Sequence, residues 1–233
     1  MNSPPSGPLA TLFQAQGRKM TYAKGELLHL GGTLPTGTYM IEAGFVEVYS
    51  LNKQDERSLH FVFGPGEVFP LSWILGHSRG NIYYEALATT TVWLLPVAVL
   101  ESYLNQSPEA FDFIRQVIEQ STLYATRIDN LEYKYARERL AYRILLLAAR
   151  FGEKQDKEVL LPSAFTQQRI ADSINLSRES VSRELDRLER RGTLEVRGRQ
   201  IVICDIVALS SELDEASGAD YWKALGLTTD NRD

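Results

Sequence analysis

The stretch from Thr166 to Arg191 carries two helix-start signals separated by a very short break. Thr166 can cap a first short helix and Ser177 a second one, because a hydroxyl oxygen accepts from the free amides of a first helical turn. Asn175 falls in the break, and asparagine enters the left-handed backbone region at low cost. Two capped helices joined by so tight a turn predict a helix-turn-helix.

The second predicted helix has an apolar stripe and a polar face. Val181, Leu185 and Leu188 recur at the spacing of a buried helix face. On the polar face, arginine can bond O6 and N7 of guanine together, and glutamate can accept from N4 of cytosine. In an isolated helix Glu179 and Arg183 would more simply form a surface ion pair. The capped helix before them and the hairpin after them favour a recognition helix instead.

Two short β-runs follow Gly192, on either side of Arg197-Gly198-Arg199. Their alternation and the central glycine predict a β-hairpin with a basic tip. A hairpin at this place is a wing, and its arginines are expected at DNA phosphates. The predicted DNA-binding residues are Thr166, Gln167, Gln168, Ser177, Arg178, Glu179, Ser182, Arg183, Arg197 and Arg199.

The segment TQQRIADSINLSRESVSRELDRLERRGTLEVRGRQIVI resembles the winged helix-turn-helix of the CRP/FNR regulators, the cyclic-AMP receptor protein and its relatives. The Ser-Arg-Glu-Ser-Val-Ser-Arg core carries the resemblance, and the wing follows at the expected distance. The resemblance implies a homodimeric transcription regulator that binds palindromic double-stranded DNA with G-T-G-A-like half-sites. It also makes RNA polymerase a candidate partner.

Residues 20–106 are predicted to form a β-roll sensor domain, because short β-runs alternate there with glycine-containing turns. Leu59, Phe61 and Phe63 alternate with Ser58, His60 and Val62, which is the period of a half-buried strand. KGELL, AGFVEVY and FGPGEVF resemble the glycine landmarks of the family's cyclic-nucleotide-binding domain. The predicted fold class is α+β, with an N-terminal antiparallel β-roll, a long dimerisation helix and a C-terminal winged helix-turn-helix.

Residues 107–136 are predicted to form the dimerisation helix and a hinge, the hinge at Tyr133 to Glu138. Spacings of 3 and 4 recur over about three heptads, as in a coiled-coil seam. A helix lying on the roll remains the alternative for one edge. The family resemblance also implies a dimerisation helix at this place. The predicted interface residues are Ile114, Val117, Ser121, Tyr124, Ile128, Leu131 and Tyr135.

The remaining segments carry weaker signals. Residues 1–19 contain proline and glycine and are expected to be loosely ordered. Residues 137–208 form the predicted DNA-binding domain, beginning with an amphipathic helix at 139–151 and a solvated loop, EKQDKE. Residues 209–233 are an acidic tail without a recognisable motif.

The net charge of −5 hides an uneven distribution. Residues 137–205 hold 14 Lys and Arg against 11 Asp and Glu, whereas the segments on both sides are acidic. The basic excess therefore coincides with the helix-turn-helix, as DNA contact requires. No signal-peptide pattern and no membrane-spanning apolar run are found, so a cytoplasmic protein without membrane contact is expected.

No catalytic, metal or cofactor site is expected. The single cysteine, Cys204, excludes a disulfide framework, a four-thiolate iron–sulfur cluster and a Cys-rich zinc site. His29, His60 and His77 lack the spacing of metal ligands. No nucleophile elbow, phosphate-binding loop or paired carboxylates were found. The alternative to a DNA-binding regulator is a ligand-binding or signalling module whose helix-turn-helix contacts another protein.

The family's nucleotide pocket would span Pro65 to Ala88. Cyclic-AMP binders have Gly-Glu where this chain has Pro70-Leu71, and leucine cannot accept a hydrogen bond from a ribose hydroxyl. Proline also lacks an amide donor. Cyclic AMP is therefore not expected to be the effector, which stays unidentified. Trp73, Tyr83 and Tyr84 would either line a pocket for another effector or simply fill the roll. The resemblance places Arg79 one residue away from the phosphate-binding arginine and Tyr124 at a helix position that contacts adenine, so the candidate pocket residues are Trp73, Arg79, Tyr83 and Tyr124.

Overall fold

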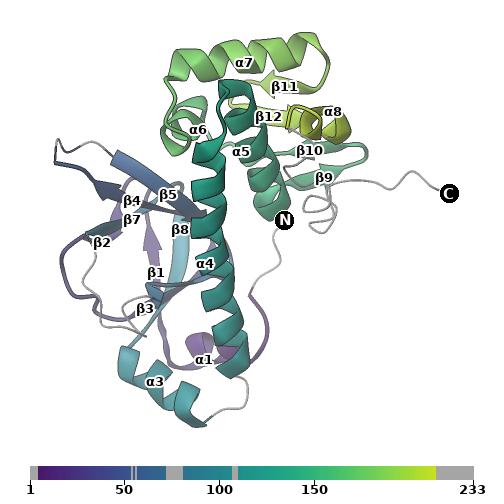
Figure 1. Cartoon of the computed structure of the whole chain (residues 1–233). Coiled ribbons are helices and arrows are strands. Elements are labelled where there is room, and N and C mark those ends of the chain that lie inside the picture. The colour runs from purple at the N-terminus through teal and green to yellow at the C-terminus, as the bar shows by residue number, and fades with distance from the viewer. Residues whose placement is uncertain (1–4, 54, 56, 72–80, 107–109, 214–233) are drawn as a thin grey trace. The chain divides into compact units, whose positions relative to one another are not determined.

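A computed structural model describes residues 5–53, 55, 57–71, 81–106 and 110–213 (Figure 1). The chain divides into two compact units, with the boundary between Arg127 and Ile128. Each unit has its own apolar core. Among the described residues, no helix combines the length and apolar character that crossing a membrane requires.

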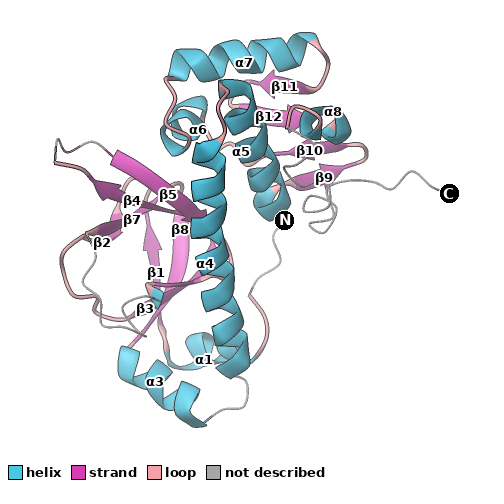
Figure 2. Ribbon diagram, in the orientation of Figure 1, coloured by secondary structure: helices cyan, strands magenta, loops and turns pink. Residues whose placement is uncertain are grey.

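The N-terminal unit contains two four-stranded sheets whose pairings are all antiparallel (Figure 2). The predicted antiparallel β-roll is therefore confirmed. One sheet has the order β1 (Arg18–Tyr22), β8 (Thr90–Leu95), β3 (Thr38–Ala43), β6 (Val68–Phe69). The other has the order β2 (Leu27–His29), β7 (Ile82–Ala86), β4 (Val46–Leu51), β5 (Arg57–Phe63).

The corner between β3 and β4, where the chain passes from one sheet to the other, depends on a glycine. Gly44 has a φ of +90°, and a Cβ there would lie 2.6 Å from Thr90 Oγ1 and 2.7 Å from the Thr89 carbonyl oxygen. The Thr90 hydroxyl donates to the Phe45 carbonyl oxygen at 3.0 Å and accepts from the Phe45 amide at 3.2 Å. Only glycine combines this backbone conformation with so close an approach.

The interior of the roll is filled by nearly parallel aromatic rings. Phe69 stacks on Tyr39, Phe63 and Tyr84, with ring centroids 5.4, 5.4 and 5.0 Å apart. These side chains belong to the buried core of the unit, together with aliphatic residues of both sheets. The Tyr39 hydroxyl donates to the Leu28 carbonyl oxygen at 3.0 Å, so its polar end is satisfied.

The expectation that residues 1–19 are loosely ordered is wrong from Pro8 onwards. Residues Pro8–Gln16 form helix α1, and β1 follows directly. The expectation rested on the proline and glycine content, but Pro8 lies in the first helical turn, where proline is favoured. Phe13 is fully buried in a second apolar cluster, to which α3 (Val97–Gln106) contributes Leu100. Tertiary burial therefore orders this segment.

Helix α4 (Ala110–Glu132) has one face against the roll. Phe113 is buried in the second apolar cluster, and Val117 packs against it. The side-chain amide of Gln116 accepts from the Val68 amide at 3.1 Å, and that of Gln120 donates to the Val68 carbonyl oxygen at 2.7 Å. These bonds pair the backbone of the short strand β6 with the helix.

The other face of α4 is apolar and exposed. The predicted seam includes only part of this exposed face. Val117, a predicted seam residue, packs against the core of its own chain, whereas Ile118, which was not predicted, is 60% exposed. Heptad spacing cannot tell which edge of a helix lies on the roll. The side chain of Tyr124 lies outside the described residues. The exposed apolar stripe on α4 consists of Phe111, Ile114, Ile118 and Ile128.

The C-terminal unit is built around α5 (Ala136–Phe151). This helix was predicted to be amphipathic, but it is buried on most sides, including Glu138 and Arg143. It ends before Gly152, as expected. The segment EKQDKE is not the predicted solvated loop, because β9 (Glu153–Gln155) and β10 (Glu158–Leu160) pair around Asp156, whose φ is +51°. Its polar composition reflects the exposure of β9.

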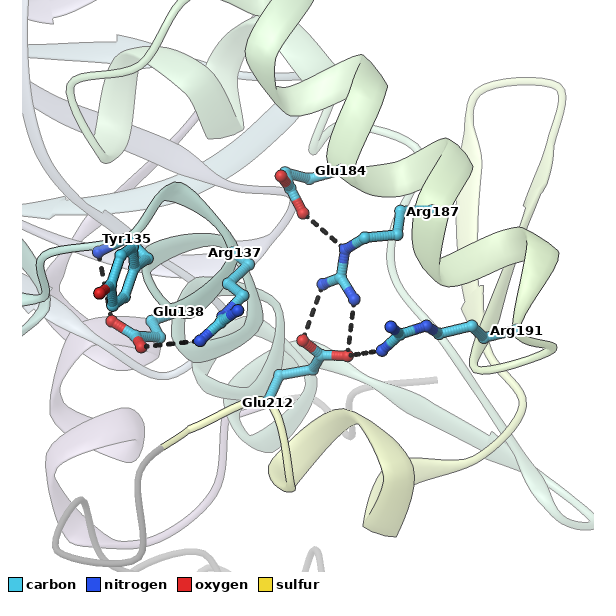
Figure 3. A network of polar contacts seen from close by, with 7 residues as sticks. All are labelled: Tyr135, Arg137, Glu138, Glu184, Arg187, Arg191 and Glu212. Carbon is cyan, nitrogen blue, oxygen red and sulfur yellow. Dashed lines mark hydrogen bonds and ion pairs between the residues drawn. The ribbon is translucent and has the colours of Figure 1, made fainter.

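The first residues of the acidic tail are ordered and carry a structural role that the sequence analysis missed. Helix α8 (Ile206–Ser210) is followed by Glu212, which lies between Arg187, on the second helix of the helix-turn-helix, and Arg191, the residue that caps the end of that helix (Figure 3). Arg187 donates two hydrogen bonds to its carboxylate at 3.0 and 2.7 Å, and Arg191 one at 3.0 Å. Arg187 also bonds Glu184 at 2.8 Å. Tail residues 214–233 lie outside the described residues.

Replacing Glu212 with glutamine should lower the free energy of unfolding at pH 7 by about 1–2 kcal/mol, because a half-buried carboxylate bridging two arginines is lost. The hydrogen bonds from Arg187 hold the pKa of Glu212 below its usual range. The ionised carboxylate therefore stabilises the fold above its ordinary pKa, and this contribution disappears as pH falls through the lowered value. Urea unfolding at pH 7 and at progressively lower pH measures both effects. Glu158→Gln, in an exposed pair, is the control and should change little.

Candidate DNA-binding surface

The predicted helix-turn-helix is confirmed by α6 (Gln167–Ser173) and α7 (Arg178–Arg190). The hydroxyl of Thr166 accepts from the Arg169 amide at 3.4 Å, and that of Ser177 accepts from the Ser180 amide at 3.1 Å. Asn175 has a φ of +52°, the left-handed conformation expected of the turn. Both caps and the turn therefore lie where the sequence analysis placed them.

Burial fixes which face of α7 points outward. Val181, Leu185 and Leu188 are each at most 1% exposed. Arg178, Glu179 and Arg183 are exposed on the opposite face, and Ser182 is half-buried. The orientation of the proposed base-reading side chains thus follows from the packing of the apolar stripe.

The predicted base-reading side chains lie around the N-terminal end of α7. A hydrogen bond from its own backbone amide, followed by one from Ser177, lowers the pKa of Glu179. Glu179 therefore stays ionised and can accept from a cytosine amine. Arg183 donates to the Ser180 hydroxyl at 3.2 Å. The positive charges of Arg178 and Arg183 contribute to the lowered pKa, but to a lesser extent.

The three polar residues at the start of the unit have different surroundings. Thr166 uses its hydroxyl as the cap of α6. Gln168 is exposed and donates to Asp172 at 2.7 Å, whereas Gln167 is half-buried. Of these residues, Gln168 has the most accessible side chain.

The wing consists of β11 (Leu194–Arg197) and β12 (Gln200–Ile203), joined at Gly198 with a φ of +66°. Its two arginines differ. Arg197 donates two bonds to Glu158, at 2.8 and 2.7 Å, and one to Glu195 at 2.8 Å. Arg199 is exposed at the tip. The prediction that both arginines contact phosphates did not foresee the partners of Arg197, because Glu158 comes from a hairpin that was predicted as a loop.

A chain of hydrogen bonds connects the end of α4 to the helix-turn-helix. The buried Asn130 side chain donates to the Arg139 carbonyl oxygen at 3.0 Å, across the predicted hinge. Arg139 in turn donates to the Ile174 carbonyl oxygen at 3.2 Å, at the turn before α7. Asn130 and Arg139 are separated by the predicted hinge, Ile174 follows 35 residues later, and the three belong to no motif, so the sequence carries no signal for these bonds.

The predicted effector residues are only partly described. Trp73 and Arg79 lie outside the described residues, as does the side chain of Tyr124. Tyr83 stacks on Tyr49 with ring centroids 5.2 Å apart. Leu71, which the resemblance places at the family's ribose-binding glutamate, is 4% exposed and belongs to the second apolar cluster.

The two described histidines are half-buried in the roll. His29 lies against the Tyr84 ring, and burial lowers its pKa. His60 contacts Ser50 through its Nε2 atom at 3.0 Å. No group of three or more His, Cys, Asp or Glu side chains within the described ranges could hold a metal ion. His77 lies outside these ranges.

Comparisons with known proteins agree with both halves of this architecture. The family model of the cyclic nucleotide-binding domain matches residues 19–107, and that of the Crp-like helix-turn-helix domain matches residues 138–212. The Electron transport regulator A of Shewanella oneidensis is 27% identical over 189 residues, covering 81% of this chain and 75% of that protein. The Fumarate and nitrate reduction regulatory protein of Vibrio cholerae is 26% identical over 215 residues, covering 90% and 82%.

Solved structures show the same fold. FixK2 from Bradyrhizobium japonicum superposes with a TM-score of 0.75 at 24% identity, covering 86% of this chain and 99% of that chain. A CooA mutant from Carboxydothermus hydrogenoformans superposes with a TM-score of 0.71 at 22% identity, covering 86% of this chain and 89% of that chain. With the roll, the long helix and the winged helix-turn-helix in the same order, the chain belongs to the CRP/FNR family of transcription regulators.

Proposed function

We propose that this regulator binds palindromic operators as a homodimer, with one recognition helix α7 reading each half-site. The outward face of α7 carries the proposal, since Arg178, Glu179 and Arg183 are exposed at its N-terminal end while its apolar stripe is buried. G-T-G-A or a close variant is the expected half-site. The protein would act in the cytoplasm, with RNA polymerase as a further partner and no enzymatic activity of its own.

Dimerisation would use the exposed apolar stripe of α4. Four large apolar side chains on one helix face are 47 to 76% exposed, and such an array in water usually marks a protein contact. Helices that meet along spacings of 3 and 4 pack as coiled coils. Two-fold pairing of α4 would also present two recognition helices to one face of the duplex.

The alternative function is that of a ligand-binding or signalling module whose helix-turn-helix contacts another protein instead of DNA. Selection of bound fragments from a random pool of duplex DNA separates the two. Enrichment of a palindrome with a G·C pair in each half-site, its halves about one helical turn apart centre to centre, supports the proposal. Absence of binding to any duplex at low salt would instead support the rival.

The arginines of α7 and of the wing should differ in what they recognise. Arg183→Ala should cost about 1–3 kcal/mol of DNA-binding free energy and relax specificity at one base pair. Arg199→Ala should weaken binding to all DNA sequences by a similar factor. It should also reduce the slope of log affinity against log salt concentration by about 1. Arg197→Ala should cost less than Arg199→Ala, because Glu158 and Glu195 already occupy its guanidinium. Fluorescence anisotropy on selected and scrambled duplexes measures all three; an equal loss for Arg197 and Arg199 would contradict this ranking.

The stripe on α4 can be tested by charge insertion. Ile128→Glu and Ile118→Glu should each shift the dimer towards monomer at micromolar concentration, because a carboxylate buried in an apolar contact costs several kcal/mol. Glu119→Gln, an exposed position beside the stripe, serves as the control. Sedimentation equilibrium measures the change. A fully dimeric Ile128→Glu protein would show that the contact lies elsewhere. If Ile128→Glu dissociates the dimer and Ile118→Glu does not, the predicted seam is favoured over the exposed stripe.

Cyclic AMP should bind with a dissociation constant of about 1 mM or weaker, since two of its polar groups would lose their partners at about 1–3 kcal/mol each. Leu71 is buried among apolar side chains and cannot bond a ribose hydroxyl. DNA affinity should not change when the nucleotide is added. Isothermal titration with cyclic AMP measures the dissociation constant. A micromolar value for the wild type, with no binding by the Arg79→Ala variant, would refute the prediction.

A further inference from the structure

One arginine of the wing is held by two carboxylates. Arg197, the last residue of β11, donates to both carboxylate oxygens of Glu158, at 2.8 and 2.7 Å. Its Nε atom donates to Glu195 at 2.8 Å. Glu195 lies two positions earlier on the same strand, so both side chains leave the same face of the sheet. Glu158 comes from β10, which is separated from β11 by β12. Three bonds to two strands thus fix one guanidinium.

This wing cluster of Arg197, Glu158 and Glu195 contains more negative than positive formal charge. The hydrogen bonds from Arg197 hold the pKa of Glu158 below its ordinary value. The bonds to Glu158 and then to Glu195 raise the pKa of Arg197. Arg197 and Glu158 therefore stay ionised at neutral pH and hold each other as a charge-assisted pair.

The wing cluster lies beside the part of the wing that is expected at DNA phosphates. Arg199, at the tip, is two residues away from Arg197 and exposed. The Glu189 carboxylate of α7 accepts from the Val196 amide at 3.1 Å, so the wing strand is bonded to the recognition helix. A duplex that contacts α7 and the tip would therefore approach Arg197 together with its two carboxylates.

Transfer of Arg197 from its carboxylates to a phosphate would be unfavourable. The guanidinium would exchange charge-assisted bonds for bonds of the same kind, so little would be gained. Glu158 and Glu195 would meanwhile be left beside the DNA polyanion without their cation, and like charges repel. The arginine therefore remains with the carboxylates, and its charge is withheld from the DNA backbone.

We propose that Glu158 and Glu195 restrain DNA binding by holding Arg197 away from the phosphate backbone. The restraint lowers the affinity for every duplex by a similar factor, because phosphate contacts carry no sequence information. Discrimination between the operator and other DNA is left to the base contacts of α7. The inference rests on the proposed DNA-binding function and adds two residues that weaken the complex.

Fluorescence anisotropy of the full chain over a series of salt concentrations tests the restraint, with the selected duplex and its scrambled version. The double variant Glu158→Gln, Glu195→Gln keeps the shape of both side chains and removes their charges. It should bind both duplexes at least about threefold more tightly at low salt, because Arg197 becomes available to a phosphate. The slope of log affinity against log salt concentration should steepen by about 1 for each wing on the duplex.

Two further variants separate this effect from others. Glu153→Gln is the matched control, since it removes the same charge from β9, at the opposite edge of the sheet from β11. Its affinity should stay close to that of the wild type. Adding Arg197→Ala to the double variant should remove most of the gain, because the released guanidinium makes the new contact. A gain in affinity also excludes partial unfolding, which would weaken binding.

Three results would overturn the proposal. Equal affinities and salt slopes of the wild type and the double variant would show that the carboxylates do not restrain binding. An equal gain in the presence of Arg197→Ala would show general charge repulsion instead of a held arginine. A changed ratio between the selected and the scrambled duplex would show an effect on base reading. Wild-type protein that binds no duplex at low salt would instead refute the proposed function, so the two failures are distinguishable.

Discussion

The DNA-binding unit depends on the burial of one helix, α5, against α7 of the helix-turn-helix and against α8. Its residues from 140 to 148 are all buried, so its neighbours pack on several sides of it. The apolar stripe of α7 packs in the same core and is fixed by it. Because the apolar stripe of α7 is buried in this core, the opposite, polar face of the helix is exposed to solvent.

Some arginines of this unit are paired with carboxylates, whereas others are exposed on the proposed DNA-binding surface. Arg187 and Arg191 are held by Glu212, and Arg197 by Glu158 and Glu195. Arg178 and Arg199 remain exposed on the proposed DNA-binding surface. Charge-assisted pairs of this kind hold a guanidinium more firmly than neutral hydrogen bonds do. The arginine content of the segment therefore overstates the charge available to phosphates.

The sensor unit retains the antiparallel roll of the family, and the described part of its interior is apolar and aromatic. Leu71 is packed into the apolar cluster instead of presenting a carboxylate, and aromatic rings fill the roll beside it. Two hydrogen bonds link the last turn of α4 to the turn of the helix-turn-helix, since Asn130 donates to the Arg139 carbonyl oxygen and Arg139 donates to the Ile174 carbonyl oxygen.

Local signals allowed the sequence alone to determine the helix-turn-helix, its caps, the left-handed Asn175, the wing and the antiparallel roll. The caps, the turn and the wing follow from neighbours within a few residues, whereas the roll was predicted from alternating runs and glycine turns without its strand order, which pairs distant segments such as β1 and β8. Only the tertiary structure decided that α1 is ordered, that EKQDKE forms a hairpin, and that Glu212 joins two arginines. It also decided which edge of α4 faces the roll. These features depend on contacts between distant segments, and a heptad pattern or an acidic residue looks the same in sequence whether its partner is solvent, the same chain or another one.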